Sequence, residues 1–127
     1  MKKYLSLFIP LLLLAGCKAP AEEASYRQIT MDEAIAIMEE ETGYLILDVR
    51  TPEEFRDKHI PGAINIPNET IGSDEIPELP DKDQLILVYC RSGNRSKQAA
   101  EKLAALGYTN IAEFGGINDW PGETVSE

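Results

Sequence analysis

Short apolar runs alternate along the chain with segments in which apolar residues recur at helical spacing. The runs predict five strands, at 26–29, 44–49, 63–66, 85–89 and 110–114. Between them, Met31, Ala34 and Met38 would share one face of a helix, and Ala99 and Leu103 one face of another. Strands that alternate with helices indicate an α/β fold with a parallel sheet, helices on both faces and right-handed crossovers.

Two helix starts carry the residues expected of a capping box. Thr30 is followed three residues later by Glu33, and Thr51 is followed in the same way by Glu54. The stretch 68–83 is acidic and is interrupted by glycine and proline, which predicts a surface connection with room for one helical turn.

A cysteine stands at the junction of the strand and the helix predicted within 85–106. The loop at this junction consists of Cys90, Arg91, Ser92, Gly93, Asn94, Arg95 and Ser96. Backbone N–H groups converge at a helix start, and Gly93 allows the bend that would aim them at the sulfur. These groups, with Arg91 and Arg95, would lower the thiol pKa of Cys90 from about 8.5 to between roughly 3.5 and 7.5. The alternative is a small buried hydrophobic residue, but this loop is poor core material.

The loop resembles the active-site loop of single-domain rhodaneses, which are sulfurtransferases that carry a sulfane sulfur as a cysteine persulfide. The resemblance extends to Leu-Ile-Leu-Asp-Val-Arg at 45–50, His-Ile-Pro-Gly-Ala-Ile-Asn-Ile-Pro at 59–67 and Gly-Gly-Ile-Asn-Asp-Trp at 115–120. It covers about 26–122. It therefore implies one rhodanese-like domain over these residues, with about five parallel strands.

The resemblance also implies a reaction. The Cys90 thiolate would take sulfur from a small anionic donor such as thiosulfate and pass it to cyanide or a thiol. Residues 91–96 would bind the substrate, while Asp48 and Arg50 would support the site by orienting neighbouring loops. The resemblance implies no cofactor, and the protein is expected to be a monomer.

Two other functions remain open at this stage. Cysteine-type phosphatases and arsenate reductases use a similar loop, but with one residue more than the four that separate Cys90 from Arg95. Some rhodanese-like domains are non-catalytic binding or regulatory modules, although inactive members typically lack the loop cysteine. His59 precedes a proline-glycine turn and is expected to be structural rather than a general base, and Trp120 is expected to be a packing residue.

The first residues read as a targeting segment. A basic start and an apolar run end in Leu-Ala-Gly-Cys at 14–17, which resembles the lipobox of bacterial lipoproteins. This pattern predicts a signal peptide at 1–16, a lipidated Cys17 and a tether over 17–25, with a short tail at 123–127. A plain secretory signal is the alternative. The protein would be anchored to a bacterial membrane by lipid and face the periplasm or the cell exterior.

Composition narrows the choice of partners. Apolar residues make up 43% of the 127, which is enough for one domain with a real core. The net charge of −10 argues against nucleic acid as a partner. The single histidine makes a metal site with histidine ligands improbable. With Cys17 acylated, Cys90 would be the only free thiol.

Overall fold

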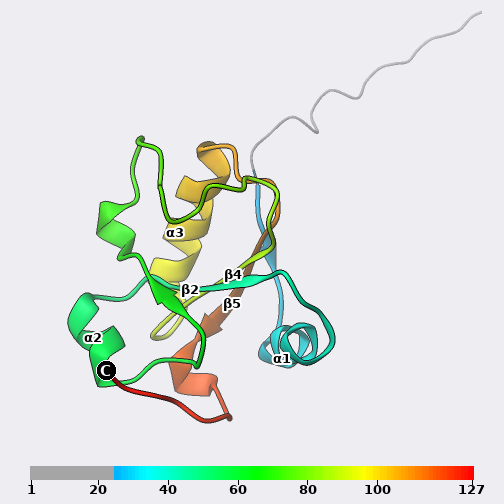
Figure 1. The fold of residues 1–127 in the computed structure, drawn as a ribbon, viewed down its shortest axis with the longest axis vertical. Coiled ribbons are helices and arrows are strands. Elements are labelled where there is room, and N and C mark those ends of the chain that lie inside the picture. The colour runs from blue at the N-terminus through cyan, green and yellow to red at the C-terminus, as the bar shows by residue number, and fades with distance from the viewer. Residues whose placement is uncertain (1–24) are drawn as a thin grey trace, which may run out of the picture.

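Five parallel strands form one sheet in the computed structural model, which describes residues 25–127 (Figure 1). In spatial order they are β1 (Arg27–Gln28), β5 (Ile111–Gly116), β4 (Ile86–Cys90), β2 (Leu45–Asp48) and β3 (Ile64–Asn65). The predicted parallel sheet is confirmed. The edge strands β1 and β3 are shorter than the apolar runs that predicted them, whereas β5 extends to Gly116 because this residue pairs with Cys90 of β4.

Three α-helices accompany the sheet: α1 (Met31–Glu40), α2 (Pro52–Asp57) and α3 (Asn94–Ala105). Both predicted capping boxes are present. Thr30 and Thr51 each accept a hydrogen bond from the backbone N–H of the glutamate three residues on, and that glutamate accepts one in return. The single turn expected within 68–83 is the 3₁₀ helix η3 (Asn68–Thr70), and a second 3₁₀ helix, η4 (Ile117–Asp119), follows β5.

Alternate side chains of β4 enter different halves of the core, as the pleat of a strand requires. Ile86, Val88 and Cys90 lie in the cluster that α3 completes. Leu87 and Tyr89 lie in the second cluster, to which α1 and α2 contribute. The helices therefore cover both faces of the sheet, with α3 opposite α1 (Figure 1).

The strand order places the chemistry-bearing loop at a switch point of the sheet. After β2 the chain moves outward to β3, whereas after β4 it moves in the opposite direction to β5. Where neighbouring connections diverge in this way, a crevice opens at the carboxyl ends of the strands, and ligands bind there in such sheets. Asp48 ends β2 and Cys90 ends β4, so both lie at this crevice.

Most of the predicted targeting segment cannot be compared with the structure. The predicted signal peptide at 1–16, the lipidation site Cys17 and all but the last residue of the tether lie outside the described residues. No helix within 25–127 is both long and apolar enough to cross a membrane.

The segment 123–127, expected to be a short tail, is bonded to the domain. Val125 exchanges two backbone hydrogen bonds with His59, at 2.8 and 2.9 Å. It ends beside α2 (Figure 1).

A buried ion pair shapes the chain after β2. Asp48 and Arg50 retain 0% and 4% of their exposure, and Arg50 Nη2 lies 2.7 Å from Asp48 Oδ2. Arg50 Nη2 also donates to the carbonyl oxygen of Lys58 at 2.7 Å, and the backbone N–H of Arg50 donates to Asp48 Oδ1 at 2.9 Å. The pair therefore ties the end of β2 to the far end of α2.

Removing one partner of this pair should be costly. We expect Arg50→Met to lower the free energy of unfolding by about 3 to 5 kcal/mol, because Asp48 would stay buried without its counter-charge. Urea unfolding measures the change. Arg56→Met, at an exposed arginine of α2, is the matched control and should change the free energy by less than about 0.5 kcal/mol. Equal stability of the two variants would contradict this account.

Candidate active site

The loop that carries Cys90 is shaped by an irregularity in β4 and by one glycine. The pairing of β4 with β5 shifts register between Val88 and Cys90, and such bulges re-aim side chains. Gly93 is the N-cap of α3 and has φ = 114°, which is costly for any residue with a Cβ. The chain therefore turns back toward the sulfur within three residues and then enters the helix.

The Cys90 sulfur is buried and hydrogen-bonded, and only 1% of the residue's surface is accessible to solvent. The backbone N–H of Gly93 donates to Sγ at 3.0 Å, and the thiol lies 3.4 Å from Ser96 Oγ. Burial raises the pKa of the Cys90 thiol, but the Ser96 side chain and the backbone N–H groups of Ser96, Gly93 and Ser92 outweigh it and hold the pKa below its ordinary value. These hydrogen bonds therefore favour ionisation of the thiol against the opposing effect of burial.

The arginines of the loop are not bonded to the sulfur. The Arg95 guanidinium binds the carboxylate of Glu54 on α2, with Nη1 to Oε1 at 2.8 Å and Nη2 to Oε2 at 3.1 Å. The pKa of Arg95 is raised chiefly by Glu54 and to a smaller extent by the charge of Cys90. Arg91 is exposed. The expected cradle of two arginines is therefore, in this structure, mainly a cradle of backbone amides and one hydroxyl.

Ser96 connects the sulfur to a residue that the sequence analysis missed. Its side chain is fully buried, and its Oγ donates to Glu113 Oε2 at 2.5 Å. Glu113 lies on β5, retains 2% of its exposure and also accepts the backbone N–H of Gly115 at 2.9 Å. A carboxylate inside the apolar run 110–114 was the signal that could have singled it out, just as the similar position of Asp48 did.

The turn after β5 closes the site from the other side. A Cβ at Gly116 would overlap the carbonyl carbon and oxygen of Arg91, so only glycine lets the two backbones approach this closely. The backbone N–H of Asn118 donates to the same Arg91 oxygen at 3.2 Å. The segment 115–120 therefore lies against the loop at 90–96. Both segments are motifs that suggested the resemblance.

The remaining sequence-selected residues take different places. Ser92 and Asn94 are exposed on the loop, and Asn94 is the first residue of α3. His59 stacks on Phe55 with ring centroids 3.7 Å apart, and its Nδ1 lies 2.7 Å from the Phe55 carbonyl oxygen, to which it must donate. Trp120 packs against the core cluster of α1 and α2. The contacts of His59 and Trp120 are thus those of packing residues.

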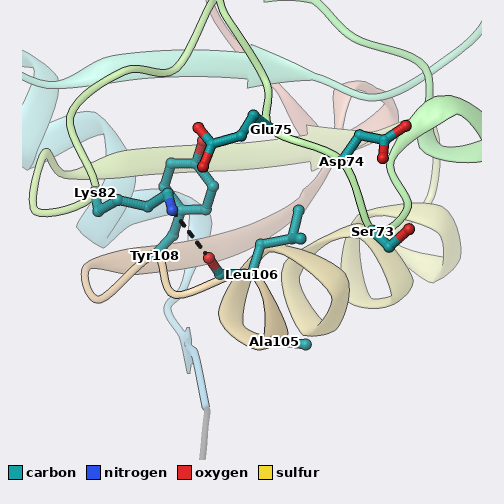
Figure 2. Close-up of a pocket in the computed structure, with 7 residues that line it drawn as sticks. All are labelled: Ser73, Asp74, Glu75, Lys82, Ala105, Leu106 and Tyr108. Atoms are coloured by element: carbon teal, nitrogen blue, oxygen red, sulfur yellow. Dashed lines mark hydrogen bonds between the residues drawn. The ribbon is translucent and has the colours of Figure 1, made fainter.

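Two hollows of about 240 Å³ each lie near opposite ends of α3. The first is beside the loop, and its lining residues come from α2 and the positions flanking it, from the loop and from η4: Arg50, Glu54, Asp57, Lys58, Arg91, Ile117 and Asn118. The second lies at the carboxyl end of α3 (Figure 2). There the Lys82 ammonium donates to the Leu106 carbonyl oxygen at 3.1 Å and caps the helix. Only the first hollow adjoins the thiol-bearing loop.

Residues that could hold a metal do not gather in the part of the chain that the structure describes. No group of three or more histidine, cysteine, aspartate or glutamate side chains within 25–127 has suitable geometry.

Comparisons with known proteins agree with this geometry. Residues 30–123 match the family described as "Rhodanese-like domain". The chain is 41% identical over 73 residues to the thiosulfate sulfurtransferase PspE of Escherichia coli, and the matched region covers 58% of the chain and 70% of that protein. It is 34% identical over 105 residues to the thiosulfate sulfurtransferase GlpE of Pseudomonas syringae, covering 79% of the chain and 95% of that protein. Some larger relatives match over only 20% to 25% of their own length.

A solved structure supports the fold. The rhodanese-like domain of the Alr3790 protein from Anabaena superposes with a TM-score of 0.72 at 28% identity, covering 81% of each chain. The sheet and its flanking helices are therefore of the rhodanese-like type.

The ion pair between Glu54 and Arg95 should leave a signature in the pH dependence of stability. The pKa of Glu54 is lowered to about 2, chiefly by the hydrogen bonds from Arg95 and to a smaller extent by those from Thr51, which together outweigh the rise from burial. The pKa in the unfolded chain is about 4.3, so the stabilisation is complete above about pH 5 and is lost as the pH falls toward 2. Glu54→Gln, which can still form the capping box, should cost about 1 kcal/mol at pH 7 and less at pH 3.

Urea unfolding of both proteins at pH 7, 5 and 3 measures the difference. Glu53→Gln, at the exposed neighbouring position of α2, is the control and should show no such trend. A difference between wild type and Glu54→Gln that stays constant from pH 7 to pH 3 would remove this ion pair from the account.

Proposed function

The chain belongs to the rhodanese-like domain family, and from this membership we propose that it is a sulfurtransferase that carries sulfur on Cys90. The observation that carries the proposal is the bonding of one sulfur by the Gly93 N–H at 3.0 Å and by Ser96 at 3.4 Å. Relatives that are 41% and 34% identical are thiosulfate sulfurtransferases, which supports thiosulfate as the donor.

The first half of the reaction loads the enzyme. The Cys90 thiolate attacks the outer sulfur of thiosulfate, and a bond forms between Sγ and that sulfur. The sulfur–sulfur bond of thiosulfate breaks, and its electron pair leaves with sulfite. The product is a persulfide anion on Cys90, whose charge would be stabilised by the backbone N–H groups that lower the pKa of the thiol.

The second half unloads it. A thiol in its ionised form, or cyanide, attacks the outer sulfur of the persulfide, and the electron pair of the broken bond returns to Cys90 as the thiolate. The products are a new persulfide or thiocyanate. Because Cys90 retains 1% of its exposure, small donors and acceptors suit the site better than bulky ones.

Local charge favours an anionic donor although the whole protein carries a net charge of −10. In the hollow beside the loop, Arg50 is paired with Asp48 and Glu54 with Arg95. The remaining ionic side chains of its lining are Lys58, Arg91 and Asp57, whose sum is positive. Attraction of the donor would therefore act at short range, within about a Debye length of 8 to 10 Å.

The rival functions find less support. A phosphatase of the cysteine type would need its loop arginine on the bound oxyanion, whereas Arg95 is engaged by Glu54. A purely binding module would have no use for a thiol whose pKa is held below its ordinary value by loop hydrogen bonds.

The persulfide can be tested by mass. After incubation of the purified chain with thiosulfate, we expect Cys90 to gain one sulfur atom and to lose it again on addition of cyanide. Cys90→Ser should gain none and turn over no thiosulfate, since a serine hydroxyl forms no persulfide. Cys17→Ser removes the other cysteine and is the matched control, which should still load sulfur. Thiosulfate turnover by Cys90→Ser would refute the mechanism.

We further infer that the protein is held at a bacterial membrane by a lipid on Cys17, with its domain in the periplasm or at the cell exterior. The support is the basic start, the apolar run and Leu-Ala-Gly-Cys at 14–17. Two or more acyl chains on one residue give stable anchoring without a membrane-spanning helix. The tether at 17–25 would then separate the domain from the bilayer.

The anchor makes its own prediction. Cys17→Ser should move the protein from the membrane fraction to the soluble fraction of bacterial cells, because no acyl chain can be attached. Fractionation followed by immunoblotting measures the shift. Cys90→Ser, which keeps Cys17, should stay with the membranes. Retention of Cys17→Ser in the membrane fraction would contradict lipidation.

A further inference from the structure

A hydrogen-bonded chain leads from the reactive sulfur into the interior of the protein. Cys90 Sγ lies 3.4 Å from Ser96 Oγ, and Ser96 Oγ lies 2.5 Å from Glu113 Oε2. All three residues are buried, with 1%, 0% and 2% of their exposure. An O–H···O distance of 2.5 Å is at the short end of charge-assisted hydrogen bonds. The sulfur and a carboxylate are therefore connected through one hydroxyl.

Glu113 has no cation to balance its charge. Neither ion pair of residues 25–127 includes it, and its neighbours in register, Val88 on β4 and Gln28 on β1, are neutral. Its Oε2 is held by the Gly115 N–H and the Ser96 hydroxyl. A buried carboxylate that is only hydrogen-bonded is expensive, and a thiolate close to it would add a second buried negative charge.

The other ionisable groups nearby do not change this balance. On α3, the Lys97 ammonium donates to the Gly93 carbonyl oxygen at 3.3 Å, and Glu101 is exposed. Ahead of β1, burial raises the pKa of Tyr26, and the charges of Glu101 and Glu113 raise it further, so this phenol stays neutral. On the other side of the loop, Arg95 is paired with Glu54. Cys90 and Glu113 are thus the two groups between which a proton can be exchanged without a change in net charge.

We propose that Glu113 accepts the proton of the Cys90 thiol through the Ser96 hydroxyl. In the thiol form, S–H donates to Ser96 Oγ, and Ser96 donates to the Glu113 carboxylate. The S–H bond then breaks as Ser96 Oγ takes that proton, and the Ser96 proton passes to Glu113 Oε2. In the product, the neutral Glu113 donates to Ser96, and Ser96 donates to the thiolate.

In both arrangements Cys90, Ser96 and Glu113 remain hydrogen-bonded to one another, and the three side chains together carry one negative charge. The reversal turns Ser96 from an acceptor of the thiol proton into a donor to the thiolate, which is the role that helps to hold the pKa of Cys90 below its ordinary value. While sulfur is carried, the proton would stay on Glu113 and leave the persulfide anion as the single charge of the site. The proposed proton transfer rests on the proposed function only in what it says of the persulfide.

The test is the pH dependence with which iodoacetamide alkylates Cys90. Two groups that share a proton ionise in two macroscopic steps, so the rate for the wild type should rise to a plateau and rise again at higher pH. Glu113→Gln can accept the same hydrogen bonds but no proton, and its rate should rise in one step. Ser96→Ala breaks the chain and should also lose the plateau. Glu101→Gln, the same change at an exposed position of α3, should keep both steps.

A purely structural role of Glu113 would leave the wild-type profile with one step, shifted along the pH axis from that of Glu113→Gln but of the same shape, and this result would overturn the proposal. Circular dichroism establishes that each variant is folded. Infrared spectra of the wild type need no substitution: at the plateau pH we expect a protonated-carboxyl band that disappears when Cys90 is alkylated. Absence of this band would equally overturn it. Because alkylation uses no sulfur donor, this outcome is independent of whether thiosulfate loads Cys90.

Discussion

The hydrogen bond from the Gly93 N–H to the Cys90 sulfur is the contact around which this edge of the sheet is arranged. It needs the bulge that re-aims Cys90, the left-handed backbone of Gly93 and the start of α3 immediately afterwards. It also needs β5 to approach the loop closely, which the absence of a side chain at Gly116 allows. A neutral backbone donor of this kind stabilises a thiolate and would also stabilise the proposed persulfide anion, because its dipole is fixed before either charge appears.

The charges close to the sulfur are arranged in pairs, which the net charge of −10 does not reveal. Arg50 is neutralised by Asp48, and Arg95 by Glu54, so two strong cations at the switch point are used to position backbone rather than to bind the sulfur. Their bidentate geometry fixes the end of β2 and the loop relative to α2. What remains for chemistry is a single negative charge, which has Ser96 and backbone amides for partners.

Local sequence patterns predicted the elements and the position of Cys90, but not the partners of the loop. Apolar runs and capping spacing depend on neighbours within a few residues. Both capping boxes and all five strands appear in the structure, although the edge strands are shorter than the runs that predicted them. The contact of Arg95 with Glu54 spans 41 positions, and that of Ser96 with Glu113 spans 17. Such contacts follow from the order of the strands, which no local pattern specifies. Glu54 was assigned one role, as a cap, whereas it has two.

The pairing of Arg95 with Glu54 has a chemical consequence for the sulfur. A thiolate in direct contact with a guanidinium would have a very low pKa, and the nucleophilicity of a thiolate falls as its pKa falls. The attacking thiol that reacts fastest has a pKa near the ambient pH. At Cys90 it is neutral donors, rather than a guanidinium in contact with the sulfur, that lower the pKa against the rise from burial. By engaging the Arg95 guanidinium, Glu54 would keep it from bonding the sulfur directly and so preserve the reactivity on which the proposed sulfur carrier depends.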